Sequence, residues 1–248
     1  MKRSLCLLLA ILICLALPVT VYAETYQISD TDLSIQFDNS IWYVFTRDNI
    51  ENNPELEELG VSYEDMCNIL NNNNAYMDSV LYYDDGDYIE LFVRKTAQTS
   101  GMANLSNYSD GKVTELAAAL AKRQNAEVYS VYQNQYKFIR LEYLDTSANL
   151  YLYEFITIVN KENYSFTFQS PSEFTDEKRE EAENIIDSIQ FEVDLTLKEK
   201  SNTSFWKNVI TKTIGGAIAG GIAGGVIALI SKKKAKKNSV SVDPTQEN

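Results

Sequence analysis

The chain has 248 residues, of which 23% are charged and 45% hydrophobic, with only 4 Pro; this composition is typical of a globular protein and unlike a disordered tail or a low-complexity fibre. It contains no His, which excludes imidazole acid–base relays and His-ligated metal sites built from this chain alone. Two of the 3 Cys, Cys6 and Cys14, lie in an N-terminal apolar segment that is predicted below to be cleaved. Cys67 is then the one remaining thiol, which excludes an intramolecular disulfide or a multi-Cys metal site. We therefore expect no cofactor and no metal.

The first 23 residues have the pattern of a secretory signal peptide. Lys2 and Arg3 precede an apolar run over residues 5–17, and Pro18 ends that run. Ala23 is a small residue where a signal peptidase would cut. A retained N-terminal anchor is the weaker interpretation, because the run has about 13 residues and a membrane span needs about 20. We predict cleavage after Ala23 and an extracellular domain over residues 24–194.

Three segments of this domain carry the periodicity of helices, with apolar side chains at i, i+3, i+4 and i+7. They are residues 63–70, 113–120 and 182–189. Ser62 with Asp65 has the spacing of a capping box, and Ser109 and Thr175 are candidate caps of the other two helices. Cys67 falls on the apolar side of the first helix, where a Cys acts as a small hydrophobic residue rather than a nucleophile.

Segments with two-residue periodicity predict strands before and between these helices. Residues 33–37 and 42–44 are joined by a short turn, and residues 80–83 and 88–93 flank Asp85-Gly86, a strong hairpin sequence. Four more strands follow, over residues 127–134, 136–144, 149–159 and 163–169. The third of these four is apolar on both faces and is expected in the middle of the sheet. Since short links favour antiparallel neighbours, the predicted fold class is α+β, an antiparallel β-sheet with flanking helices.

Two acidic segments of this domain are candidate functional loops, and the first of them could bind a cation. Asp84, Asp85 and Asp87 surround the hairpin turn, but they lack the spacing and the distal Glu of a calcium loop. We expect a solvated turn there. The second segment has four Glu around Pro54, and it is predicted to be a solvated loop. The members of this second segment are Glu51, Glu55, Glu57 and Glu58.

The order of the predicted elements resembles that of the PsbP/Mog1-like superfamily. Trp42 is the aromatic residue just after the first turn, and the last helix ends in Ile185-Ile186-Asp187-Ser188-Ile189-Gln190-Phe191, similar to the family's ending. The resemblance covers residues 31–193, with Asn39 where the family usually has Pro. It implies an αβα sandwich that acts as a non-enzymatic binding module, and it transfers no functional residue by motif.

Beyond a juxtamembrane stalk over residues 195–208, the chain is predicted to cross a membrane once. Residues 209–230 are apolar apart from Lys212, and the 18 residues from Thr213 span about 27 Å as a helix. Five Lys follow, namely Lys232, Lys233, Lys234, Lys236 and Lys237. By the positive-inside rule they place the basic tail, residues 231–248, in the cytoplasm. We therefore predict one C-terminal transmembrane helix in the cell membrane, with the bulk of the chain extracellular. A buried Gly/Ala-rich core helix is the weaker interpretation of the same residues.

Glycines recur along the predicted transmembrane helix at four-residue spacing. Gly216, Gly220 and Gly224 form one series, and Gly221 and Gly225 repeat the spacing one position on. In a helix this spacing stacks small residues on one face, where two backbones can approach closely. The pattern predicts helix packing in the membrane, either in a homo-oligomer or with a membrane protein partner.

The charge of the predicted extracellular part limits the classes of partner that it can bind. Residues 24–205 hold 33 acidic and 13 basic side chains, a net charge of −20. This field repels nucleic acid and favours cations or a basic partner. We expect a membrane-anchored extracellular binding module of unknown ligand that is not an enzyme. One alternative is an accessory subunit of a membrane complex assembled through the glycine-rich helix, and another is a surface hydrolase that uses paired carboxylates.

Overall fold

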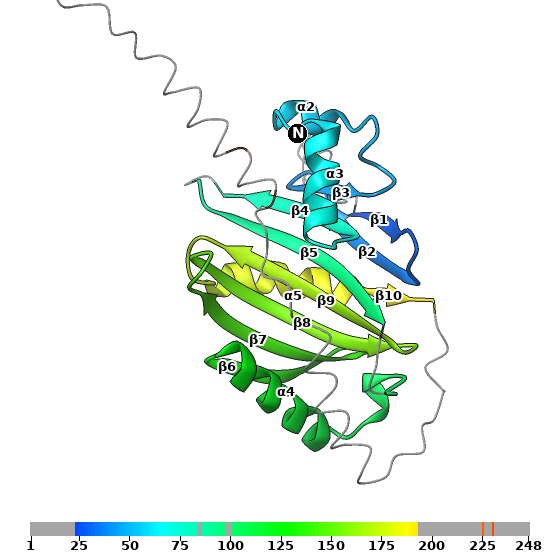
Figure 1. Ribbon diagram of the computed structural model, residues 1–248, viewed down its shortest axis with the longest axis vertical. Helices are drawn as coiled ribbons and strands as arrows, with labels where there is room; N and C mark the ends of the chain where they lie inside the picture. The colour runs from blue at the N-terminus through cyan, green and yellow to red at the C-terminus, as the bar shows by residue number, and fades with distance from the viewer. Residues whose placement is uncertain (1–22, 84–85, 98–100, 193–224, 226–229, 231–248) are drawn as a thin grey trace, which may run out of the picture.

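A seven-stranded antiparallel sheet forms the centre of the molecule (Figure 1). The structure, a computed structural model, describes residues 23–83, 86–97 and 101–192 together with Gly225 and Ile230. The predicted stalk and basic tail lie outside these residues, as does nearly all of the predicted signal peptide and transmembrane helix. In spatial order the strands are β3 (Trp42–Thr46), β4 (Met77–Tyr82), β5 (Tyr88–Ala97), β9 (Glu162–Ser170), β8 (Leu150–Val159), β7 (Lys137–Asp145) and β6 (Val128–Gln133).

A separate three-stranded sheet has the order β1 (Ala23–Ile28), β2 (Leu33–Asp38) and β10 (Gln190–Phe191). The sequence predicted that β2 and β3 would be antiparallel neighbours, and this is wrong. β2 pairs with β1 and β10, whereas β3 pairs with β4. The turn between β2 and β3 carries the chain from one layer to the other, so that the rings of Phe37 and Trp42 meet edge to face at 5.6 Å in the core between the sheets.

Helices cover both faces of the seven-stranded sheet (Figure 1). α3 (Tyr63–Asn72) packs on β3, β4 and β5, and α4 (Asp110–Gln124) packs on β6, β7 and β8. α5 (Asp176–Ser188) lies on the opposite face beside β2, with which it shares the largest core cluster. A 3₁₀ turn, η1 (Leu105–Asn107), precedes α4. The fold class is therefore α+β with antiparallel sheets, as predicted.

The predicted helix ends are mostly confirmed. Ser62 and Asp65 form a capping box at α3, with Asp65 N donating to Ser62 Oγ at 3.1 Å. Thr175 caps α5 by accepting from Lys178 N at 3.3 Å. Ser109 occupies the N-cap position of α4 but makes no side-chain cap bond. Sequence spacing thus located all three helix starts, but it did not distinguish a bonded cap from an unbonded one.

The predicted acidic loop around Pro54 is wrong, because the segment forms a short helix, α2 (Pro54–Glu58). Asn53 caps it by accepting from Glu55 N at 2.9 Å, and Pro54 occupies the first turn, where its missing N–H costs nothing. Leu56 is buried under α3. Two strands, β1 and β10, were also not predicted.

The largest core lies between the seven-stranded sheet and the layer of α5 and β2. Edge-to-face aromatic contacts run through it, with Phe138 at 6.1 Å from Phe166 and Phe155 at 6.2 Å from Phe168. β8 lies inside the sheet between β7 and β9 and is buried on both faces, which confirms the predicted central strand. Among the helices within the described ranges, none has the length and apolar character that a membrane crossing requires.

Candidate binding site

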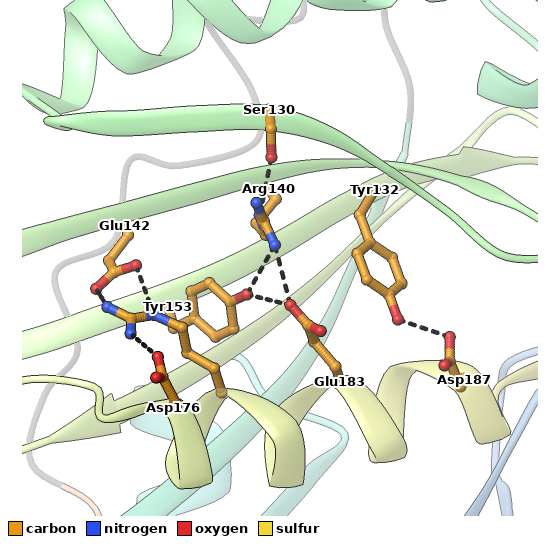
Figure 2. A network of polar contacts seen from close by, with 9 residues as sticks. Ser130, Tyr132, Arg140, Glu142, Tyr153, Asp176, Glu183 and Asp187 are labelled. Atoms are coloured by element: carbon orange, nitrogen blue, oxygen red, sulfur yellow. Dashed lines mark hydrogen bonds and ion pairs between the residues drawn. The ribbon is translucent and has the colours of Figure 1, made fainter.

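Helix α5 is fixed to the sheet by a network of half-buried polar side chains (Figure 2). Arg140 on β7 donates to Ser130 Oγ at 2.8 Å, to Tyr153 OH at 3.2 Å and to Glu183 Oε1 at 2.9 Å. Tyr153 in turn donates to the same oxygen of Glu183 at 2.6 Å. Burial raises the pKa of Tyr153 above its ordinary value, so its hydroxyl stays a donor. The network holds the Glu183 carboxylate in one place.

A second set of contacts fixes the two ends of α5 (Figure 2). Arg179 binds Glu142 on β7 through two nitrogens, at 2.8 and 3.2 Å, and also pairs with Asp176 at 3.2 Å. The hydrogen bond to Glu142 raises the pKa of Arg179. Near the other end of the helix, Tyr132 on β6 donates to Asp187 Oδ1 at 2.8 Å. Both ends of α5 are therefore held against the strands at one side of the sheet.

A surface cavity of about 340 Å³ opens along this side of α5. It is named the acidic groove below, and its lining consists of Tyr132, Asp176, Arg179, Glu180, Glu183, Asn184 and Asp187. Its four carboxylates recur every three or four residues of α5 and so lie on one face of the helix. The lining has four carboxylates and one guanidinium, that of Arg179. Arg140 behind it pairs with Glu183, so the groove keeps a net negative charge.

The carboxylates of the groove differ in how they are held. Glu183, Asp176 and Asp187 accept hydrogen bonds from arginine or tyrosine side chains. The side chains of Glu180 and Asn184 are exposed and make no hydrogen bond or ion pair within the described part of the chain. The groove thus combines a fixed framework with polar groups that remain open to a ligand.

A different polar cluster is buried on the opposite face of the sheet, between α3 and α4. Glu154 on β8 accepts from Ser165 at 3.0 Å, from Tyr143 at 3.3 Å and from Thr167 at 3.4 Å. Arg94 donates to the same Thr167 hydroxyl at 3.3 Å. Burial raises the pKa of Glu154 and lowers that of Arg94. The polar groups of this cluster form their hydrogen bonds with one another, so we assign the cluster a structural role.

The hairpin turn between β4 and β5 is tied to α5. Asp87 was predicted to be solvated; this is wrong, because it forms an ion pair with Lys178, whose exposed fraction is 4%. Lys178 Nζ also donates to Ser170 and Ser172, each at 2.7 Å. Burial raises the pKa of Asp87, but hydrogen bonds from Lys178 and Ser172 outweigh it, and the net pKa is lowered. Asp84 and Asp85 lie outside the described residues.

Of the glycines and lysines singled out in and after the predicted transmembrane helix, Gly225 alone lies within the described ranges. Gly225 is buried against the Glu90 carboxylate of β5, so closely that a side chain there would collide with it, and Ile230 packs against the core under α3. These two contacts lie within the folded domain and differ from the predicted packing in a membrane helix. Cys67 is half-buried beside the α3 core and forms no disulfide among the described residues. Outside the described ranges lie Gly216, Gly220, Gly221, Gly224, Lys232, Lys233, Lys234, Lys236 and Lys237. In the described part of the chain, no group of three Cys, Asp or Glu could hold a metal.

Sequence reasoning missed the residues that make the polar networks. A pattern in the sequence could have found some of them, because a charged residue inside an apolar strand is usually paired. Glu154 is the one charged residue of β8, and Arg140 interrupts the apolar positions of β7. The spacing of acids along α5 could have indicated an acidic helix face, but not which of these acids are bound by arginine.

Comparison with known proteins does not assign the chain to a family, because no protein-family model and no curated protein matches this sequence.

Proposed function

We propose that the protein is a membrane-anchored extracellular binding module that contacts its ligand through the acidic groove. The observation that carries this proposal is the contrast within the groove, where Glu180 and Asn184 are open while neighbouring acids are fixed to the sheet. A fixed framework lowers the entropy cost of binding, because few side chains must be ordered by the ligand. The negative charge selects a cationic or basic partner.

A non-enzymatic role is supported by the hydrogen bonds and ion pairs that the carboxylates already make within the domain. A glycosidase-like mechanism needs one acid and one base that both face a substrate. Glu183 is engaged by Arg140 and Tyr153, and Glu142 is engaged by Arg179. The hydrolase alternative therefore gains no support from these pairs.

The membrane anchor is proposed from the sequence alone, and the contacts of Gly225 and Ile230 with the domain do not support it. The signal segment, the apolar residues 209–230 and the following Lys block together favour a single-pass protein with an extracellular domain. The αβα sandwich of PsbP/Mog1-like proteins remains part of this proposal, and helices on both faces of one sheet are compatible with it.

The glycine series supports a second candidate role, as an accessory subunit that assembles in the membrane. Replacing Gly220 with Leu should abolish an oligomer or a complex that depends on close helix packing. Ile222→Phe adds bulk on the opposite side of the same helix and is the matched control. An oligomer that survives Gly220→Leu unchanged would contradict this role.

Site-specific photo-crosslinking tests the groove as the binding surface. A photoreactive amino acid is placed at Asn184 in the groove, or at Glu115, which is exposed on α4 at the other face. Full-length protein is irradiated in its native membrane, and captured proteins are identified by mass spectrometry. We expect a specific partner from position 184 that is absent from position 115. Equal capture at both positions, or capture of nothing, would contradict the proposal.

A further inference from the structure

The strand beside the acidic groove is an unprotected sheet edge. β6 ends the seven-stranded sheet, and within the described residues no strand pairs with its outer side. Its sequence, VYSVYQ, has neither Pro nor a charged residue, although natural edge strands usually carry such residues to block pairing. Val128 and Tyr129 are 49% and 44% exposed. The outer side of β6 therefore offers backbone donors and acceptors to an extended chain.

The two faces of β6 have different chemistry. Ser130 and Tyr132 point towards α5, as their contacts with Arg140 and Asp187 show (Figure 2). Val131 points the other way and packs with the core under α4. Because side chains alternate along a strand, a chain added to β6 would direct every second residue over the acidic groove. The residues between would lie on the apolar α4 side.

We propose that β6 binds an extended segment of a partner protein by strand addition, with basic residues at alternate positions over the acidic groove. This inference rests on the proposed function and names its partner class. Charge complementarity selects the basic segment, since the groove holds four carboxylates and one guanidinium. Apolar residues at the intervening positions would cover the exposed ring of Tyr129.

The same charges disfavour a second copy of this chain as the occupant. Antiparallel pairing of two β6 edges around a two-fold axis would place both α5 helices on one face, on either side of the junction. Each α5 carries six acidic and two basic residues. The two acidic grooves would then face each other, and like charges at that position oppose assembly.

Peptide binding to the purified full-length chain tests the proposal. The probe is a capped peptide of alternating Lys and Val, compared with a peptide of alternating Glu and Val and with a fully N-methylated Lys/Val peptide. We expect binding of the first peptide alone, with increased hydrogen-exchange protection of the Val128–Gln133 amides. Glu180→Gln should weaken that binding about twofold to fivefold, as for one exposed ion pair. Glu115→Gln on α4 is the matched control and should have no effect.

Any other outcome overturns the inference, and each one points to a different explanation. Equal binding of the N-methylated peptide would show recognition by charge without strand pairing, and it would leave the proposed binding function intact. Protection of β6 that depends on protein concentration without peptide would identify a second copy as the occupant. If neither peptide binds while crosslinking from position 184 still captures a partner, strand addition is wrong although the groove binds. Failure of both experiments would reject the binding function itself.

Discussion

Replacing Lys178 with Met should destabilise the domain by about 3 kcal/mol. The ammonium group is buried, pairs with Asp87 and donates to two serine hydroxyls. Met has a similar volume but carries no charge, so the variant deprives the Asp87 carboxylate of its cationic partner. The tie between the β4–β5 turn and α5 is lost in the same step.

The magnitude follows from the burial of the pair. Removing one partner of a buried ion pair costs about 3–5 kcal/mol, and the lower end applies because the Asp87 side chain is 18% exposed. Adding Asp87→Asn to the variant removes the stranded charge and should recover about 2 kcal/mol. Lys122→Met, at an exposed position of α4, is the control and should stay within about 0.5 kcal/mol of wild type.

Urea unfolding followed by fluorescence of the buried Trp42 measures these differences. The pH dependence provides a second check. The pKa of Asp87 is lowered in the folded state, so its contribution to stability is present above the unfolded pKa of about 3.9 and is lost as pH falls below it. The gap between wild type and Lys178→Met should narrow below about pH 4. A gap under about 0.5 kcal/mol at pH 7 would refute the reasoning, since a surface change has that size.

Three further results are expected. Ser62→Ala should cost about 1 kcal/mol in urea unfolding and Ser109→Ala much less, because the α3 cap is bonded and the α4 cap is not; equal costs would contradict this. Burial raises the pKa of Glu154, so Glu154→Gln should gain stability relative to wild type as pH rises from about 4 to 7, and a difference independent of pH would count against it. N-terminal sequencing of the mature protein should begin at Glu24, whereas an intact Met1 would disprove signal cleavage.

The sequence predicted the elements with strong periodicity and missed those that depend on distant contacts. The four strands from β6 to β9 and the three long helices were predictable because their apolar residues repeat at the period of the element. β10 has two residues, and its pairing with Leu33 and Ser34 joins chain segments more than 150 residues apart. Periodicity carries no information about such a contact.

The layer assignment of β2 and β3 failed for a related reason. A short link favours a hairpin, but it permits a change of layer when both strands have separate partners. β2 is bound on both sides by β1 and β10, and β1 was hidden because only Ile28 in it is buried. In the candidate site, the acids of α5 were visible in the sequence. Their arginine partners on the sheet and on the helix could be assigned only once the strands were placed.

The contacts of β10 determine how a mechanical load on that strand would spread through the domain. A pull on the chain directly after Glu192 would act first on β10. Glu192 N donates to Asp32 O at 2.8 Å, Phe191 N donates to Tyr136 OH at 3.0 Å, and Phe191 packs its ring against Tyr164 at 4.8 Å. Such a force is thus shared among the β1–β2 turn, the β6–β7 turn and β9 before it reaches α5. The acidic groove can keep its shape while β10 is under tension.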